Sequence, residues 1–386
     1  MQIFKQPSFL FMKYKFIAFS LSGILIISGI VNITKGKGIA YGIDFAGGTL
    51  IQIRFKNIFP IAELRQELGA AELGTSKIQE VEEGEREFII RTTLPEEEAE
   101  QDLEAHEIVG TRIVEALRTE EDLSSLSRGL ADLNNLDIDE LTVILQDAFP
   151  DDAKEIGQRI IRHRESNEFK GIIESYDQLR AKGISDETIE ILKDKTFLGS
   201  MAVKRRETVG PQVGADLRKK ATQATIWALI GMLLYIGIRF KFAYGVSAIL
   251  TLAHDVLVTI GIFSFTDREI NLPVVAAILT IVGYSLNDTI VIFDRVRDNL
   301  KILRKHDFGE ILDASINQTL SRTVITSGTT FLTVFALFIL GGEVINDFAF
   351  TMIVGVVVGT YSSIYQSCPI LYFWNKIFKP KKGMGK

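Results

Sequence analysis

Residues 272–293 read LPVVAAILTIVGYSLNDTIVIF, an apolar run in which Asp288 is the one acidic residue. A bilayer core of about 30 Å needs about 20 apolar residues in a helix. Inside the bilayer the backbone must satisfy its own hydrogen bonds, so this run predicts a transmembrane helix. At 1.5 Å per residue, Asp288 lies about 9 Å deeper than Asp294, which marks the expected membrane edge.

Five further stretches meet the same criterion: residues 14–34, 221–238, 242–265, 321–340 and 345–370. The first follows basic residues as a signal peptide does, but it is long and lacks a clear small-residue cleavage site, so a retained helix is expected. The chain is 47% hydrophobic and 24% charged, and most of its acidic residues lie between 56 and 200. The sequence therefore predicts a membrane protein with a six-helix α-helical transmembrane bundle and one charged domain.

The basic residues near the ends of the spans predict their orientation. Six spans place on one side Lys5, Lys13, Lys15, Arg239, Lys241, Arg295, Arg297, Lys301, Arg304, Lys305, Lys376, Lys379, Lys381 and Lys382. The opposite short loops carry Asp267, Arg268, Glu269, Glu343 and Asp347. By the positive-inside rule both termini are expected in the cytoplasm. The expected division is 1–34 with the first span, 35–220 outside the cytoplasm, 221–375 with the other spans, and a basic tail over 376–386.

The external domain shows the periodicities of a small α+β fold. Ile51, Ile53 and Phe55 alternate with polar residues as in a half-buried strand, and a helix is expected around Leu64. A hairpin is expected over 77–93 with its turn near Glu83-Gly84, then a helix near Ile113 and Leu117 and a last strand over 203–209. This β-α-β-β-α-β order predicts a ferredoxin-like frame over 42–118 and 198–214.

A charged, leucine-rich stretch over 119–197 interrupts this frame and is expected to be a helical insertion. Two roles remain open for it: a stabilising spacer, or a docking surface for a partner. The net charge of −6, which lies mainly in the external domain, argues against nucleic acid as its ligand.

Polar residues within the spans are candidates for proton transfer. The carboxyl group of Asp288, in a motif with Asn287, can be neutral or charged according to its neighbours. Arg322 begins the fifth span and can pair with Asp288, or it can simply extend to the membrane surface. His254 and Asp255, near the middle of the third span, either handle protons or clamp two helices. A stripe of polar residues at helical spacing lies along the fifth span: Thr319, Thr323, Thr326, Thr330 and Thr333.

Two glycine-rich motifs flank the external domain. The first, residues 42–49, contains Gly42, Asp44, Gly47 and Gly48, and the second, residues 209–214, contains Gly210, Pro211 and Gly214. Glycine allows tight turns and close backbone approach, so both motifs are expected to have structural roles.

The sequence has no P-loop and no Cys or His cluster with metal spacing, so no cofactor or metal, no ATPase and no enzyme activity are expected. Its single cysteine, Cys368, excludes an intrachain disulfide. The transmembrane gradient remains as an energy source, worth about 2.3 kcal/mol per charge at 100 mV.

These motifs together resemble the SecF family, the smaller subunit of the SecDF accessory complex of bacterial protein secretion. The matching pieces are residues 42–49, 209–216, 253–256, 283–297 and 319–330. The resemblance covers all six spans and the ends of the external domain, whereas the stretch 119–197 departs from the pattern.

The resemblance implies a fold of the superfamily of proton-driven multidrug exporters (RND) and a place in the bacterial cytoplasmic (inner) membrane, among its lipids. It implies pairing with SecD, association with the SecYEG channel, and use of the proton-motive force to promote preprotein translocation after the SecA step. The family's intramembrane aspartate matches Asp288 and its essential arginine matches Arg322. Two alternatives stay open: half of a proton-driven exporter of small molecules or lipids, and a passive scaffold.

Overall fold

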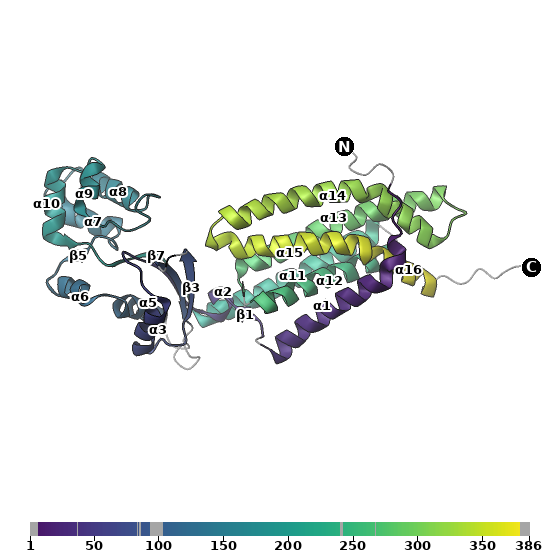
Figure 1. Cartoon of the computed structure of the whole chain (residues 1–386), viewed down its shortest axis with the longest axis horizontal. Coiled ribbons are helices and arrows are strands. Elements are labelled where there is room, and N and C mark those ends of the chain that lie inside the picture. The colour runs from purple at the N-terminus through teal and green to yellow at the C-terminus, as the bar shows by residue number, and fades with distance from the viewer. Residues whose placement is uncertain are drawn as a thin grey trace, which may run out of the picture. The chain divides into compact units, whose positions relative to one another are not determined.

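The computed structural model describes residues 7–36, 38–82, 84, 86–92, 103–239, 242–266 and 268–378. The chain forms two compact units, one built from the segments up to Gly42 and from Asp216 onward, the other from Ile43–Ala215 (Figure 1). Several residues named above lie outside the described part of the chain: Lys5, Glu83, Lys241, Asp267, Lys379, Lys381 and Lys382.

The first unit is a bundle of long helices, which confirms the predicted fold class. Over the described residues, six helical segments are long and apolar enough to cross a membrane. Their helices are α1 (Lys15–Lys35), α11 (Pro211–Arg239), α12 (Phe242–Thr266), α13 (Leu272–Ile302), α14 (Phe308–Leu340) and α15 (Glu343–Tyr365). The short helix η1 (Phe11–Tyr14) precedes α1, and α16 (Ser367–Phe378) follows α15.

Several helices extend beyond the apolar runs that predicted them. Helix α13 continues to Ile302, and α14 begins at Phe308 instead of near residue 321. A capping box at the start of α14 explains this, because Asp307 caps the helix and Glu310 bonds back to the Asp307 N–H. Hydropathy marks the part of a helix suited to lipid, whereas the backbone hydrogen bonds continue past it.

Glycines allow two pairs of these helices to pack closely. A Cβ atom built on Gly29 of α1 would lie 2.7 Å from the Gly261 Cα of α12. A Cβ atom on Gly355 of α15 would collide with the Ile281 side chain of α13. Small residues at such crossings let helices approach closely in a membrane, where water provides no hydrophobic drive.

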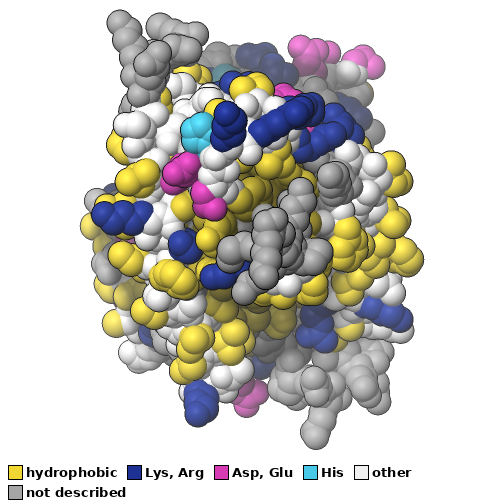
Figure 2. All heavy atoms as spheres, turned by 90° about the vertical axis from the view of Figure 1, so that its right-hand side faces the viewer, with side chains coloured by type: hydrophobic (Ala, Val, Ile, Leu, Met, Phe, Trp, Pro, Cys, Tyr) yellow, Lys and Arg dark blue, Asp and Glu magenta, His cyan; other side chains and the backbone are white. Residues whose placement is uncertain are grey.

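One end of the bundle carries basic side chains. Figure 2 looks onto the end where α13 joins α14 and shows Lys and Arg side chains around hydrophobic ones. Arg295, Arg297, Lys301 and Arg304 belong to this end. It is the end that the positive-inside rule predicts to face the cytoplasm.

The second unit contains a four-stranded antiparallel sheet of order β3-β4-β2-β7. Its elements are β2 (Gly48–Phe55), α3 (Ile61–Ala70), β3 (Lys77–Glu82), β4 (Glu87–Thr92), α5 (Leu103–Ala116) and β7 (Met201–Val209). This order is the ferredoxin-like arrangement that the sequence predicts. Ile51, Ile53, Leu64, Phe88 and Ile113 form its core and are fully buried.

Helices fill most of the segment between α5 and β7. They are α6 (Glu120–Ser127), α7 (Ile138–Gln146), α8 (Ala153–Arg164), α9 (Tyr176–Ala181) and α10 (Asp186–Lys195), with the short strands β5 (Ala131–Asp132) and β6 (Thr196–Phe197) paired in parallel. They enclose a separate core that includes Leu141, Leu145 and Leu192. The Asn135 amide fastens this insertion to the frame, since it donates to the Met201 carbonyl at 2.9 Å and accepts from the Val203 N–H at 2.8 Å.

Glu87 is a buried charge in the sheet and accepts hydrogen bonds from three side chains. Gln52 and Lys204 donate to its Oε1 atom, both at 2.7 Å, and Arg54 donates to Oε2 at 2.8 Å. Burial by itself raises the pKa of Glu87, but Lys204, Arg54 and Gln52 together hold that pKa below its usual 4.5. A carboxylate with a lowered pKa stabilises the fold above its unfolded-state pKa, and this contribution is lost as the pH falls through the folded-state value.

We therefore expect the β2 and β4 amides to lose hydrogen-exchange protection, corrected for intrinsic rates, as the pH falls below about 4. In Glu87→Gln this acid dependence should disappear. The free energy of opening from hydrogen exchange at pH 7 should also drop by about 2 kcal/mol, because Arg54 loses its charge-assisted bond. Mass spectrometry of the full chain in detergent measures both. Glu63→Gln, at an exposed position of α3, is the control, and an equal response of the two variants would contradict the prediction.

Candidate functional site

Asp288 lies in the middle of a contact between two spans. It is on α13, 4% exposed, and its Oδ2 atom accepts a hydrogen bond of 3.2 Å from Ser327 Oγ of α14. Within the described residues, the structure shows no ion pair to this carboxylate. A buried acid held by one neutral hydroxyl can exchange its proton without first breaking an ion pair.

Two buried hydroxyl groups without a described partner flank this contact. They are Tyr284 Oη on α13 and Thr323 Oγ1 on α14. Tyr284 lies one turn before Asp288, and Thr323 lies one turn before Ser327. Because α13 and α14 are antiparallel neighbours, these two residues lie one turn to either side of the Asp288–Ser327 contact along the bundle. Buried polar groups of this kind are usually satisfied by water.

Unlike the buried Asp288 carboxylate, the side chains of Arg322 and Asn287 are exposed. Arg322 interacts electrostatically with Asp288, but over the described residues it forms no ion pair or hydrogen bond with it. The direct pair considered from the sequence is therefore absent in this conformation.

Three of the five hydroxyls in the polar stripe of α14 are satisfied within their own helix. Thr319, Thr326 and Thr333 donate to backbone carbonyls one turn earlier, at 3.0 Å each. Such bonds leave the hydroxyl oxygen able to accept from a further donor.

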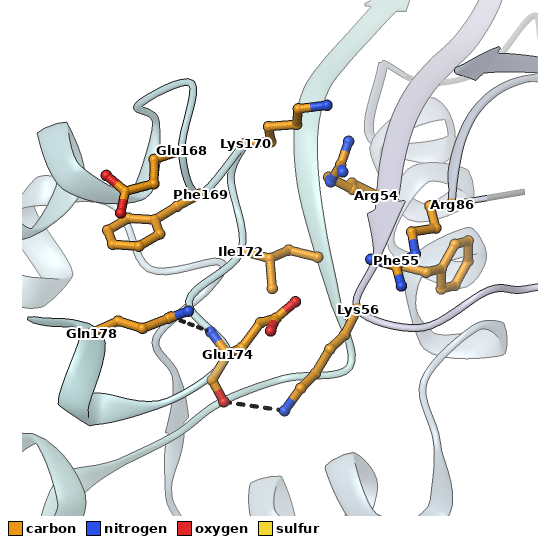
Figure 3. A pocket seen from close by; sticks show the side chains of 10 residues that line it. All are labelled: Arg54, Phe55, Lys56, Arg86, Glu168, Phe169, Lys170, Ile172, Glu174 and Gln178. Carbon is orange, nitrogen blue, oxygen red and sulfur yellow. Dashed lines mark hydrogen bonds between the residues drawn. The ribbon is translucent and has the colours of Figure 1, made fainter. Parts of the chain in front are cut away.

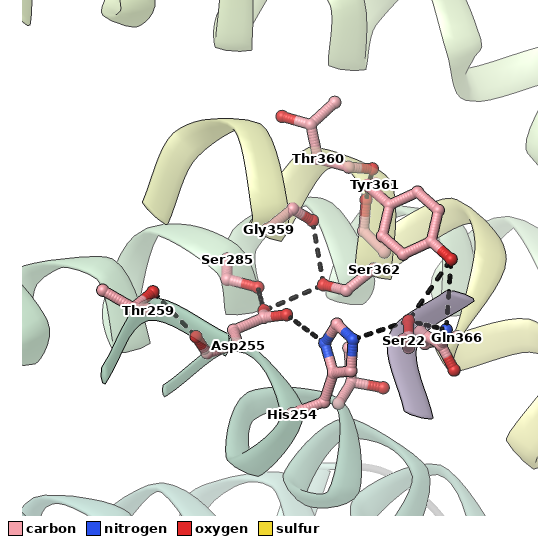
Figure 4. A network of polar contacts seen from close by, with 12 residues as sticks. Ser22, His254, Asp255, Thr259, Ser285, Gly359, Thr360, Tyr361, Ser362 and Gln366 are labelled. Atoms are coloured by element: carbon pink, nitrogen blue, oxygen red, sulfur yellow. Dashed lines mark hydrogen bonds and ion pairs between the residues drawn. The ribbon is translucent and has the colours of Figure 1, made fainter. Parts of the chain in front are cut away.

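Asp255, on α12, is the centre of a second polar cluster (Figure 4). It is 1% exposed. Ser285 of α13 and Ser362 of α15 donate to its Oδ2 atom at 2.6 and 2.8 Å. His254 Nδ1 lies 2.9 Å from its Oδ1 atom. The cluster therefore joins three spans at one carboxylate.

The cluster continues from His254 to the first span. His254 Nε2 lies 2.9 Å from Ser22 Oγ of α1, and Gln366 Nε2 donates to the same oxygen at 2.7 Å. Tyr361 Oη donates to the Ala18 carbonyl at 2.9 Å. Ser22, Ser362 and Gln366 were not predicted from the sequence. Their signal is weak, because single polar residues inside apolar runs resemble ordinary helix contacts.

The distances allow two protonation states of His254 with the same heavy-atom positions. In the neutral ring we assign the proton to Nδ1, which donates to Asp255, while Nε2 accepts from Ser22. A proton added at Nε2 reverses the second bond, and the Ser22 hydroxyl then turns toward Tyr361 Oη at 3.3 Å. This arrangement can bind or pass a proton without moving a helix.

Helix α13 connects the two polar centres. Ser285 bonds Asp255, and Asp288 lies three residues later, less than one turn away. Each centre thus depends on the position of the same helical turn.

The first glycine motif begins at the last residue of one segment of the helical unit and continues into the α+β unit. Gly42 N–H donates to the Ile270 carbonyl at 3.0 Å, next to the short parallel pair β1 (Ala40–Tyr41) and β8 (Glu269–Ile270). Asp44 lies in the short helix α2 (Ile43–Ala46). Gly48 begins β2 at a φ of +130°.

The two motifs touch within the α+β unit. Gly47 has a φ of +75°, and a Cβ atom there would lie 2.8 Å from Pro211 Cα. One on Gly214 would lie 3.0 Å from Gly47 N, whereas one on Gly210 would meet nothing within 4 Å. A larger residue at position 47 is excluded by both its φ and this contact. Among the described residues no group of His, Cys, Asp or Glu side chains is arranged to hold a metal ion.

Comparison with known proteins matches most of the chain to one family. Residues 189–377 match the C-terminal model of the protein export membrane protein SecD/SecF, and residues 36–57 match the SecD/SecF GG motif. The protein translocase subunit SecF of Koribacter versatilis is 36% identical, with 96% of this chain and 93% of that one covered.

A fused relative and its crystal structure agree with this match. The protein translocase subunit SecDF of Thermus thermophilus is 50% identical over 168 residues, which are 44% of this chain and 23% of that one. The crystal structure of SecDF, a translocon-associated membrane protein from Thermus, aligns with a TM-score of 0.65 and 30% identity. That alignment covers 96% of this chain and 39% of the longer SecDF chain.

Proposed function

The chain belongs to the SecF family of protein translocase subunits, and from this we propose that it couples proton flow to the export of preproteins. As a translocase membrane subunit it belongs to a transport family and not to a family of catalytic enzymes. The observation that carries the proton-coupling proposal is Asp288, a buried carboxylate with one neutral hydroxyl partner inside a membrane span.

In the proposed cycle Asp288 is the main proton carrier. Its flanking hydroxyls, Tyr284 and Thr323, hold water that delivers and removes the proton. Loss of the charge on Asp288 ends its attraction to Arg322, so α13 and α14 can change their relative position. The Asp255–His254 cluster responds to the same movement through Ser285.

We propose that SecD is the first partner. The fused SecDF relative supports this, because SecF-like and SecD-like parts of one polypeptide are held together by covalent linkage. The SecYEG channel and the emerging preprotein are the further partners. In this proposal the chain lies in the cytoplasmic membrane with both termini inside, and the α+β unit acts on the preprotein outside.

The test measures preprotein export in vesicles that contain this chain, its SecD partner and the channel. We expect the stimulation of export to vanish when an ionophore collapses the gradient, and Arg322→Ala to abolish most of it with the gradient intact. Arg304→Ala, at an exposed position just after α13, is the control and should match the wild type.

Two results would contradict this proposal. Stimulation that persists without a gradient and in Arg322→Ala would indicate a passive scaffold. Purification as a homo-oligomer without SecD or the channel would instead favour an exporter of small molecules or lipids.

A further inference from the structure

A pocket lies where the insertion meets the α+β frame, entirely within the second unit (Figure 3). Its volume is about 240 Å³, and ten residues from both parts line it. Those residues are Arg54, Phe55, Lys56, Arg86, Glu168, Phe169, Lys170, Ile172, Glu174 and Gln178. The frame contributes the end of β2 and the turn before β4, and the insertion contributes the segment between α8 and α9 together with Gln178 of α9.

The lining has more cations than anions, although the chain as a whole has a net charge of −6. Its cations are Arg54, Lys56, Arg86 and Lys170, and its anions are Glu168 and Glu174. An excess of cations in the lining favours an anionic ligand.

Contacts outside the pocket already offset one of its two anions. Lys182, which is not in the lining, forms an ion pair of 2.5 Å with Glu168. Glu87, next to the pocket, forms ion pairs with Arg54 at 2.8 Å and with Lys204 at 2.7 Å. Its single negative charge therefore balances only one of these two positive charges. Among the described residues, the positive balance is therefore larger than the lining residues alone indicate.

The pocket is held in shape from both sides. Lys56 Nζ donates to the Glu174 carbonyl at 3.2 Å, and Gln178 Oε1 accepts from the Glu174 N–H at 2.9 Å. Lys170 has a φ of +47°, which is uncommon for a residue other than glycine, and its exposed side chain extends over the pocket. Arg86 is also exposed.

We propose that this pocket binds carboxylate side chains of an extended polypeptide passing the external domain. Arg86 and Lys170, one from the frame and one from the insertion, are the main contacts. The inference rests on the proposed function for the identity of the polypeptide, a translocating preprotein, and it gives the insertion a role in holding that chain. Repeated weak contacts with acidic residues of the preprotein would hold it near the domain and still allow it to dissociate.

The test measures binding of a labelled unstructured peptide to the full chain in detergent by fluorescence anisotropy. One peptide carries Asp and Glu, and its partner carries Asn and Gln at the same positions. We expect the acidic peptide to bind about tenfold more tightly at low salt, as loss of one charge-assisted contact implies. The difference should shrink as salt rises.

Variants then locate the site. Arg86→Gln with Lys170→Asn should remove the preference for the acidic peptide, and asparagine tolerates the positive φ at position 170. Arg65→Gln with Lys154→Asn removes one exposed charge from the frame and one from the insertion outside the pocket, and should leave the preference unchanged. Equal binding of the two peptides, or equal effects of the two double variants, overturns the proposal.

This assay has no membrane gradient. A chain that failed to couple protons would still show the preference, so the result separates the pocket from the proton mechanism.

Discussion

The Asp288→Asn variant is expected to lose gradient-driven export while its amount in the membrane stays normal. Asparagine has nearly the same shape and can still accept the Ser327 hydrogen bond, but it cannot take up a proton. One proton moving through 100 mV supplies about 2.3 kcal/mol, which corresponds to a factor of about 50, so the loss should be severalfold or more. Protease protection of a preprotein in energised vesicles measures it.

Asp294→Asn is the matched control for this variant. Asp294 lies on the same helix, is about half exposed, and forms an ion pair of 3.2 Å with Arg297 one turn away. Exposed pairs of this kind contribute little, so export should be close to that of the wild type. Unchanged export in Asp288→Asn at normal protein level would rule out Asp288 as the proton carrier.

The Asp255→Ala variant is expected to weaken the bundle itself. It leaves the His254, Ser285 and Ser362 groups without their shared acceptor. Hydrogen bonds between membrane helices contribute about 0.6 kcal/mol each, so the free energy of unfolding should fall by about 2 kcal/mol. Thermal unfolding in detergent, followed by near-ultraviolet circular dichroism, measures the change.

Two serine variants calibrate that measurement. Ser362→Ala removes one bond to Asp255 and should destabilise by about a third as much. Ser363→Ala alters the adjacent residue, whose hydroxyl donates to the Thr360 carbonyl of its own helix, and should have little effect. If Asp255→Ala behaves like Ser363→Ala, the cluster does not hold the spans together.

Much of the fold could be predicted because its signals are local. Apolar runs of membrane length identified all six spans, and the alternation around Ile51 and Ile53 identified the central strand of the sheet. The exact helix ends could not be predicted from hydropathy, since α14 begins at a polar cap, Asp307, well before its apolar part.

The candidate site was predicted only in part, for a different reason. An acid inside an apolar run is conspicuous, so Asp288 and Asp255 stood out. Their partners come from spans far apart in the sequence: Ser327 from α14, Ser362 from α15 and Ser22 from α1. Which serines meet which acid depends on helix rotation and crossing, and these are set by the packing of the whole bundle.

The tight crossing of α15 against α13 restricts how the bundle can move. With Ile281 seated where Gly355 has no side chain, α13 cannot slide along α15 without a steric collision. We therefore expect these two helices to move together, and a shift of α13 to fall at its boundary with α14. There Ser327 is the hydrogen-bond partner of Asp288, and Asn299 bonds Ser315 nearer the end of α13. A proton arriving at Asp288 then acts on the boundary that can still shift, and a bulky residue in place of Gly355 is expected to disturb the packing of α13 on α15 without touching either acid.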